Sequence, residues 1–270
     1  MVQQALPQRD PSDPDGAASP VLQAPRLGKP LGATGLPPGP TVQAVALLLP
    51  GGPAAGVRRP SYRALAAQRP LARRLTRAAG EEGLAVHVLR YRHRGWNGSA
   101  ADPVGDVRWA ADEAVRRYGD VPVCLAGQGM GARAALLAAG HPAVASVLAL
   151  APWLPEPDAV LAPDPVRQLA GRRVLIVHGT NDERTDPDLS YRLAERAKKL
   201  NRDVCRFEVH SDGHALHQHR PEVLALAADF VRGSLLGHPY ARPVADAFAA
   251  PPPLGLRMPL ASGFGESLRH

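Results

Sequence analysis

Six mainly apolar runs, separated by stretches with helical periodicity, most constrain what this chain of 270 residues can fold into. The run Val-Leu-Ile-Val at 174–177 is apolar on both faces of a strand, which suits a sheet with helices on both sides. Alternation of strands and helices predicts right-handed crossovers and a doubly wound, mainly parallel α/β sheet of about six strands. We expect strands at 42–49, 84–91, 121–126, 145–150, 173–178 and 204–210, and helices at 70–82, 102–118, 131–139, 187–200 and 221–235.

Two helix starts have a local cause in the sequence. Asp102 precedes Pro103, which predicts an N-cap followed by a proline in the first helical turn, and Pro187 opens its helix in the same way. In a doubly wound sheet, ligands bind at the carboxyl ends of the strands. We therefore expect functional residues directly after the strands.

The two ends of the chain differ in composition from its middle. Residues 1–40 carry nine prolines and no periodic apolar pattern, so they are predicted to be a disordered segment. Residues 41–236 are predicted to form the folded domain. Residues 237–270, with three consecutive prolines at 251–253, are predicted to be a largely irregular tail.

The charge of the chain raises the question of a nucleic-acid partner. The net charge is +7, but the arginines are spread along the chain, lysine occurs three times, and aromatic residues make up 4%. These features argue against nucleic acid. A basic binding module for an acidic partner remains an alternative from another functional class.

Several features bear on the compartment and on cofactors. No run of 18 apolar residues predicts a membrane span, and residues 1–10 lack the pattern of a signal peptide. Cys124 and Cys205 lie in strand-like runs, which indicates core thiols rather than a disulfide framework. The histidines at 210, 214, 217 and 219 lack Cys or carboxylate partners at ligand spacing. We expect a cytoplasmic protein with no membrane partner, no metal and no cofactor.

A glycine-rich run at 124–132, Cys-Leu-Ala-Gly-Gln-Gly-Met-Gly-Ala, fits two different motifs. It matches the G-x-G-x-x-A fingerprint of dinucleotide-binding folds. That fingerprint needs the first strand of its domain and an acid about 20 residues later, to hold the ribose. Two predicted strands precede this run, and the first acid after it is Glu156, in a proline-rich loop. The dinucleotide interpretation is therefore rejected.

The same run matches G-x-S-x-G, the nucleophile elbow of serine hydrolases, with Gly129 in place of serine. An elbow needs a strand, a sharp turn with a strained central residue, and a helix. Glycine takes a positive φ without the ~1 kcal/mol or more that other residues lose there. Asp182 follows the fifth predicted strand and His214 follows the last one, in the order nucleophile, acid, histidine of the α/β-hydrolases.

These motifs resemble those of small bacterial α/β-hydrolases of the esterase, dienelactone-hydrolase and lysophospholipase-like group, over about residues 41–236. Besides the elbow, the resemblance rests on Gly95-Trp96-Asn97-Gly98 and on Ala149-Leu150-Ala151-Pro152-Trp153. It implies an α/β-hydrolase fold. The short connection from Pro152 to Gly171 argues against a large cap domain.

The resemblance also implies roles for individual residues. Asp182 would be the acid and His214 the base, and the oxyanion hole would be formed by the amides of Met130 and of the Gly51–Gly52 loop. The chain departs from its relatives at two adjacent positions: Gln128 stands where histidine is usual, and Gly129 stands where the serine is.

The loss of the hydroxyl excludes acyl-enzyme chemistry at Gly129 and leaves two hypotheses for the pocket. The first is a degenerate hydrolase that binds a small ligand. The second is a non-covalent hydrolase or lyase that acts on an ester-like substrate with an Asp182–His214 general-base dyad, which supplies about 10²–10⁴-fold. The sequence does not decide whether the protein is an enzyme.

Overall fold

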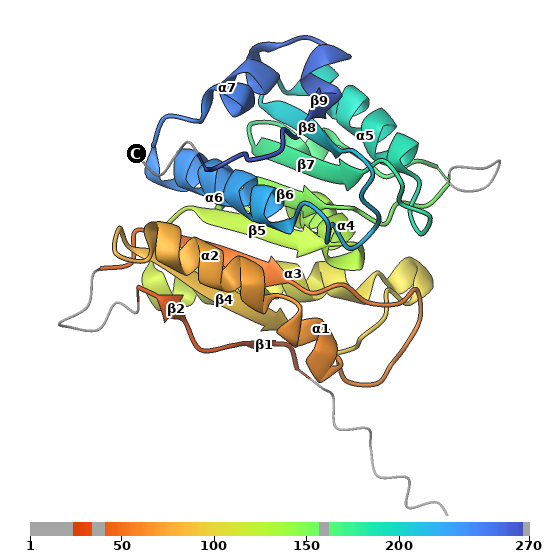
Figure 1. The fold of residues 1–270 in the computed structure, drawn as a ribbon. Coiled ribbons are helices and arrows are strands. Elements are labelled where there is room, and N and C mark those ends of the chain that lie inside the picture. The colour runs from red at the N-terminus through yellow and green to blue at the C-terminus, as the bar shows by residue number, and fades with distance from the viewer. Residues whose placement is uncertain (1–23, 34–40, 157–161, 267–270) are drawn as a thin grey trace, which may run out of the picture.

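The computed structural model describes residues 24–33, 41–156 and 162–266. In this part of the chain, nine strands form one sheet in the order β1-β4-β3-β5-β6-β7-β8-β9, and β2 also pairs with β4. Strands β3 to β9 are parallel, while β1 and β2 run antiparallel to β4. The fold class predicted from the sequence is therefore confirmed (Figure 1).

The strands are β1 (Arg26–Leu27), β2 (Leu31–Gly32), β3 (Ala44–Leu49), β4 (Leu84–Arg90), β5 (Val123–Gln128), β6 (Val144–Leu150), β7 (Arg173–Gly179), β8 (Val204–Val209) and β9 (Met258–Pro259). The α-helices are α1 (Tyr62–Ala66), α2 (Arg69–Ala79), α3 (Asp102–Tyr118), α4 (Met130–Ala138), α5 (Pro187–Leu200), α6 (Arg220–Leu236) and α7 (Arg242–Ala249). Short 3-10 helices lie at Gly98–Ala100, Arg167–Leu169 and Leu254–Leu256.

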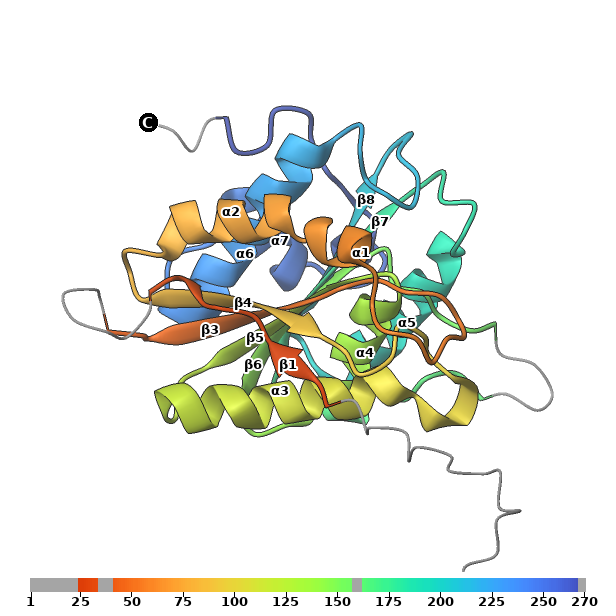
Figure 2. The ribbon, with the colours of Figure 1, turned by 90° about the horizontal axis from the view of Figure 1, so that it is seen from below.

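Helices cover both faces of the sheet, which explains why its central strands are mainly apolar on both sides. Helices α2 and α6 lie on one face, and α3, α4 and α5 lie on the other (Figure 2). In β3, Val45 and Leu47 belong to the core beneath α3 and α4, while the alternating Ala46 and Leu48 belong to the core beneath α2 and α6. Every residue of β3 is fully buried.

The central elements match the prediction closely, and one cap does not. Helices α3 and α5 have the predicted bounds. Asp186 caps α5, since its side chain accepts a hydrogen bond from the amide of Asp188, and Pro187 follows it as predicted. The prediction for Asp102 is wrong: the N-cap of α3 is Ala101, with φ of 44°, and Asp102 is the first helical residue. The carboxylate of Asp102 instead accepts a hydrogen bond from the side chain of Asn97.

The predicted N-terminal segment 1–40 needs a correction at residues 24–33. These residues form β1 and β2 on the edge strand β4, with Arg26 opposite Arg90 and Leu31 opposite Val86. Strands of two residues are too short to show a periodic apolar pattern. They are held in place by backbone hydrogen bonds to β4 rather than by burial of their own side chains. The disorder predicted for residues 1–23 and 34–40 lies outside the described residues.

The predicted irregular tail, 237–270, is also more regular than its composition suggests. It contains α7 and the strand β9, which pairs with β8 and places Met258 opposite Phe207. Val244 and Ala247 of α7 are fully buried against the main core, so the tail is part of the folded domain up to residue 266. None of the helices in the described ranges is long and apolar enough to span a membrane.

Candidate active site

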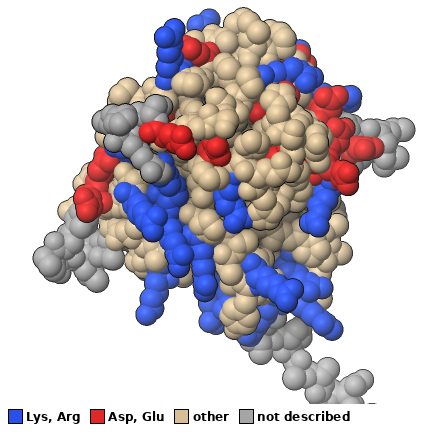
Figure 3. All heavy atoms as spheres, in the orientation of Figure 1, with Lys and Arg blue, Asp and Glu red and all other residues tan. Residues whose placement is uncertain are grey.

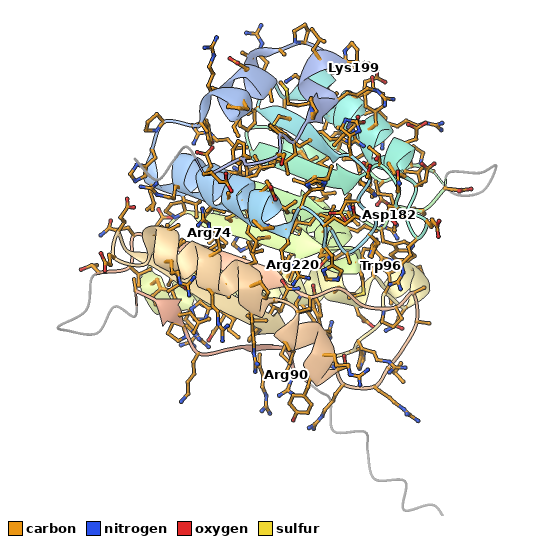
Figure 4. The ribbon with its side chains drawn as sticks, in the orientation of Figure 1. Arg74, Arg90, Trp96, Asp182, Lys199 and Arg220 are labelled. Carbon is orange, nitrogen blue, oxygen red and sulfur yellow. The ribbon has the colours of Figure 1, made fainter. Side chains whose placement is uncertain are left out.

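The residues singled out in the sequence meet at one edge of the sheet. Gly129 follows β5, Asp182 follows β7, His214 follows β8, and Gly51 and Gly52 follow β3. Because parallel strands end at the same edge, these loops converge beside the start of α4, close to the labelled Asp182 (Figure 4).

Gly129 forms the corner between β5 and α4, with φ of 55° and ψ of −117°. Its two neighbouring glycines are required by close packing. A Cβ at Gly127 would meet the carbonyl carbon of Gly131 at 2.3 Å, and one at Gly131 would meet the carbonyl oxygen of Leu49 at 2.2 Å. A Cβ at Gly129 would instead point at His214 and lie 3.3 Å from its Nε2. The space where a side chain of residue 129 would stand is therefore next to the imidazole.

Asp182 is a buried carboxylate with five hydrogen-bond donors around it. Its Oδ2 accepts from Nδ1 of His214 (2.9 Å), from Nε2 of His178 (3.1 Å) and from the hydroxyl of Thr185 (2.6 Å). Its Oδ1 accepts from the amides of Arg184 and Thr185. Burial raises the pKa of Asp182, but these hydrogen bonds outweigh it and hold the pKa well below its usual range. Asp182 is therefore ionised at neutral pH.

The ionised Asp182 decides the tautomer of His214. Its carboxylate accepts a hydrogen bond from Nδ1–H, so in the neutral imidazole the proton is on Nδ1 and Nε2 carries a lone pair. Nε2 faces the space above Gly129, and the side chain of His214 is 22% exposed, so this nitrogen is open to a ligand.

A second histidine supports Asp182 from behind. His178, at the end of β7, is fully buried, and its Nδ1 lies 2.9 Å from the hydroxyl of Ser190 on α5. The same hydroxyl accepts a hydrogen bond from Nε of Arg206, which lies on β8. The carboxylate is thus fixed to two strands and one helix.

The loop that carries His214 is organised by the buried Asp212. Its carboxylate accepts hydrogen bonds from the amides of His217 (3.0 Å) and His219 (3.1 Å). Gln128, the last residue of β5, donates from its amide side chain to the carbonyl oxygen of His214 at 3.2 Å. Gln128, which stands where the motif usually has histidine, therefore connects the elbow to the loop that carries His214.

Three backbone amides at this edge have no acceptor among the described residues: those of Gly51, Gly52 and Met130. The first two belong to the loop after β3, and the third opens α4, whose N-terminus carries the positive end of the helix dipole. A Cβ at Gly52 would collide with the carbonyl oxygen of Arg94 at 2.2 Å, so only glycine fits there.

A cleft of about 810 Å³ opens over this group. Apolar side chains from α2 and α6, such as Leu71 and Val223, form much of its wall. Arg184 and Arg220 are its charged lining residues, and no Asp or Glu is among the described residues that line it. The cleft therefore combines an apolar wall with a positive surround.

The structure brings together all six predicted site residues, listed here: Gly51, Gly52, Gly129, Met130, Asp182 and His214. Sequence reasoning missed His178, Thr185, Asp212 and Arg220. A histidine inside the otherwise apolar run 174–178 was the one visible indication, whereas the other three depend on tertiary contacts.

No protein-family model matches the chain, and no curated protein matches it in sequence. Solved structures do match. An α/β serine hydrolase without a lid from Xanthomonas campestris is 18% identical, with 80% of this chain and 97% of that one covered and a TM-score of 0.52. The esterase Pf2001 of Pyrococcus furiosus is 14% identical, with 72% and 84% covered and a TM-score of 0.54.

A third match is Est1E from Butyrivibrio proteoclasticus, solved with ferulic acid bound. It is 13% identical, with 78% of this chain and 95% of that chain covered and a TM-score of 0.55. In the described residues between β6 and β7, this chain has a single 3-10 helix and no cap domain. From its strand order, its mainly parallel sheet and these similarities, we conclude that the chain has the α/β-hydrolase fold.

Proposed function

We propose that this protein is related by descent to the serine esterases, has lost its nucleophile at Gly129, and binds a small ligand in the cleft without forming an acyl-enzyme. One observation carries the proposal. Gly129 has a corner conformation, with φ of 55°, that other residues adopt only under strain, and the side chain it lacks would point at Nε2 of His214. Asp182 and His214 would be the former acid and base, and the amides of Met130, Gly51 and Gly52 the former oxyanion hole.

Gly129 has no side chain and therefore offers no nucleophilic atom for covalent catalysis at the elbow. Removal of the serine costs on the order of 10⁶ in kcat in subtilisin, the worked case for this loss. Cys124 cannot substitute, because it is fully buried and burial raises the pKa of its thiol to about 12. Burial also raises the pKa of the Cys205 thiol, which lies on the distant strand β8.

The lining of the cleft favours a carboxylate ligand with an apolar body. One carboxylate oxygen would accept from the amides of Met130 and Gly52, and the other would lie above Gly129 beside Nε2 of His214, which would donate to it if the imidazole took up a proton with the ligand. Arg184 and Arg220 add positive charge at the wall, and the ligand meets no carboxylate there. Est1E, with its bound ferulic acid, directs the choice of test ligands to aryl acids.

Thermal shift and calorimetry with ferulic acid, its primary amide and a set of alkyl acids test the proposal. We expect the acids to bind and the amide to bind at least about tenfold more weakly, because a charge-assisted hydrogen bond is about twice as strong as a neutral one. His214→Ala and Arg220→Gln should weaken binding, while Arg192→Gln on α5 should not. Equal affinity for acid and amide, or no binding by any acid to folded protein, would contradict the proposal.

A second candidate function rests on the orientation of His214. Its Nδ1 is held by Asp182 at 2.9 Å, so Nε2 can take a proton from a water molecule above Gly129. In that case 4-nitrophenyl acetate would be hydrolysed without a burst and without an acyl adduct, and His214→Ala would lower the rate about 10²-fold or more. An unchanged rate in His214→Ala would remove this candidate.

A further inference from the structure

The positive charge of the protein is concentrated on one side of the fold. Residues 24–101 contain twelve Lys and Arg but only two acids, Glu81 and Glu82, so their charge excess is larger than the +7 of the whole chain. The remaining residues therefore carry a small net negative charge. The expectation that the arginines are spread along the chain is corrected by this asymmetry.

Six exposed arginines of α1, α2 and the loop before them form what we call the basic face: Arg58, Arg59, Arg63, Arg69, Arg73 and Arg77. Three of them, Arg69, Arg73 and Arg77, are spaced four residues apart and so form a stripe along the outer side of α2. None of the six makes an ion pair with another described residue. In the space-filling view, Lys and Arg side chains gather over the region where Figure 1 has α1 and α2, and Asp and Glu lie mainly above it (Figure 3).

The basic face continues onto the edge of the sheet. Arg90 of β4 lies under the ring of Tyr62, with its guanidinium carbon 5.4 Å from the ring centre. Arg26 of β1 pairs with Arg90, and the exposed Lys29 follows on the same edge. The positive surface therefore extends from α2 through α1 to β1.

Apolar side chains are exposed within this positive surface. Val57 is 70% exposed and Tyr62 is 81% exposed, and both flank Arg58 and Arg59 in the sequence. Leu31, on β2, is 45% exposed at the sheet edge. Water-exposed aliphatic side chains beside unpaired arginines suit an anionic lipid surface, in which the arginines meet phosphate groups and the apolar side chains enter the interface. Of these three exposed side chains only Tyr62 could stack on a nucleic-acid base, whereas single-strand binding surfaces stack successive bases on several aromatic side chains.

We propose that the basic face docks peripherally on membranes that contain anionic phospholipids, with Val57 and Tyr62 inserted at the interface. This differs from the sequence expectation of no membrane partner, which rested on the lack of a spanning segment. Helix α1 connects the two surfaces of the protein, since Ala64 and Ala66 line the cleft while Tyr62 and Arg63 are exposed. The proposal does not depend on the chemistry at Gly129.

Co-sedimentation of the full-length chain with vesicles tests this proposal. We expect binding to vesicles of phosphatidylcholine mixed with phosphatidylglycerol and none to phosphatidylcholine alone, at physiological ionic strength. Combining Arg69→Gln, Arg73→Gln and Arg77→Gln should lower the partition coefficient at least about tenfold, since each basic residue near an anionic surface adds to the attraction. The matched control combines Arg192→Gln, Lys199→Gln and Arg202→Gln, which removes three exposed charges far from the basic face and should leave binding within about twofold.

The pair Val57→Ser and Tyr62→Ser separates lipid docking from a general attraction to polyanions. This double variant should weaken binding to the anionic vesicles and leave retention on heparin unchanged. Because Val57 and Tyr62 are exposed, their replacement should not disturb folding, so the proposal can still be tested if the triple arginine variant does not fold. Any of three results would overturn the proposal. These are equal vesicle binding by both triple variants, unaltered vesicle binding by the Val57 and Tyr62 double variant, and retention on DNA without any vesicle binding.

Discussion

Position 129 combines a backbone conformation that favours glycine with a side-chain direction that points at His214. The corner between β5 and α4 needs φ of 55°, and the atom that a serine would bring there would lie beside Nε2 of His214. A serine hydrolase accepts the strain of the corner for the sake of the hydroxyl. Glycine removes the strain and the reactive atom at once, which leaves the shape of the corner intact.

The hydrogen bonds that Asp182 accepts from His178 and His214 should contribute to the stability of the fold. Asp182→Asn keeps the size of the side chain but replaces one acceptor oxygen by a donor, which faces His178 and His214. We expect the variant to lose about 1–3 kcal/mol of unfolding free energy at neutral pH, because a buried donor is left unsatisfied. Urea unfolding of both proteins measures this loss.

The loss should depend on pH in a defined direction. The folded-state pKa of Asp182 is depressed below the unfolded value of about 3.9, so its ionised form stabilises the fold above that pH. The difference between wild type and Asp182→Asn should therefore be full at pH 6 to 7 and shrink as the pH falls below about 4. A difference that grows on acidification would contradict the assigned hydrogen bonds.

At the scale of elements, Arg133 joins helix α4 to the loops around the site. Its guanidinium forms a bidentate pair with Asp164, at 2.7 and 2.8 Å, and lies over the rings of Trp96 and Trp153. The two rings meet edge to face, 5.8 Å apart. One side chain of α4 thus fixes the loops after β4 and β6 against the helix that follows Gly129.

Removal of this contact should loosen the loops more than the core. Arg133→Met preserves apolar packing but leaves the partly buried Asp164 without its cation, so we expect a loss of about 3–5 kcal/mol in unfolding free energy. Tryptophan emission should shift to the red as Trp153 becomes more exposed. Arg167→Met, at an exposed position without an ion pair among the described residues, is the control and should change neither quantity.

The elements that the sequence predicted well are those with a cause in their own residues. Helix α5 is predicted at both ends, because Pro187 marks its start and its apolar period runs to Leu200. Strand β1 could not be predicted, since Arg26 and Leu27 are held by β4 rather than by a pattern of their own. The cap at Ala101 depends on the turn before α3, which the dipeptide Asp102-Pro103 does not reveal.

The same distinction applies to the site. Asp182 and His214 could be predicted because each follows a strand directly in the expected order. His178 and Asp212 act through tertiary hydrogen bonds, to Asp182 and to the amides of the His214 loop, which no local pattern encodes. Gln128 was seen in the sequence as a departure, and only the fold gives it a partner, the carbonyl oxygen of His214.

At the scale of the whole molecule, the cleft and the basic face lie on either side of α1. A ligand in the cleft and a membrane on the basic face would therefore contact neighbouring parts of the fold. The arginine stripe was visible in the sequence as a four-residue spacing at 69, 73 and 77, but its significance depends on the acids being elsewhere in space. Chain-wide net charge could not show that separation.

The central claim is that the catalytic arrangement is complete apart from one hydroxyl, and a serine-directed fluorophosphonate probe tests it most directly. Wild type, Gly129→Ser and the double variant Gly129→Ser with His214→Ala should be treated alike and analysed by intact mass and peptide mapping. We predict no adduct on the wild type, stoichiometric labelling of Gly129→Ser at residue 129, and a rate at least about 10³-fold lower in the double variant, because the hydroxyl then lacks its base. Labelling of the wild type, or no labelling of a folded Gly129→Ser protein, would contradict the account.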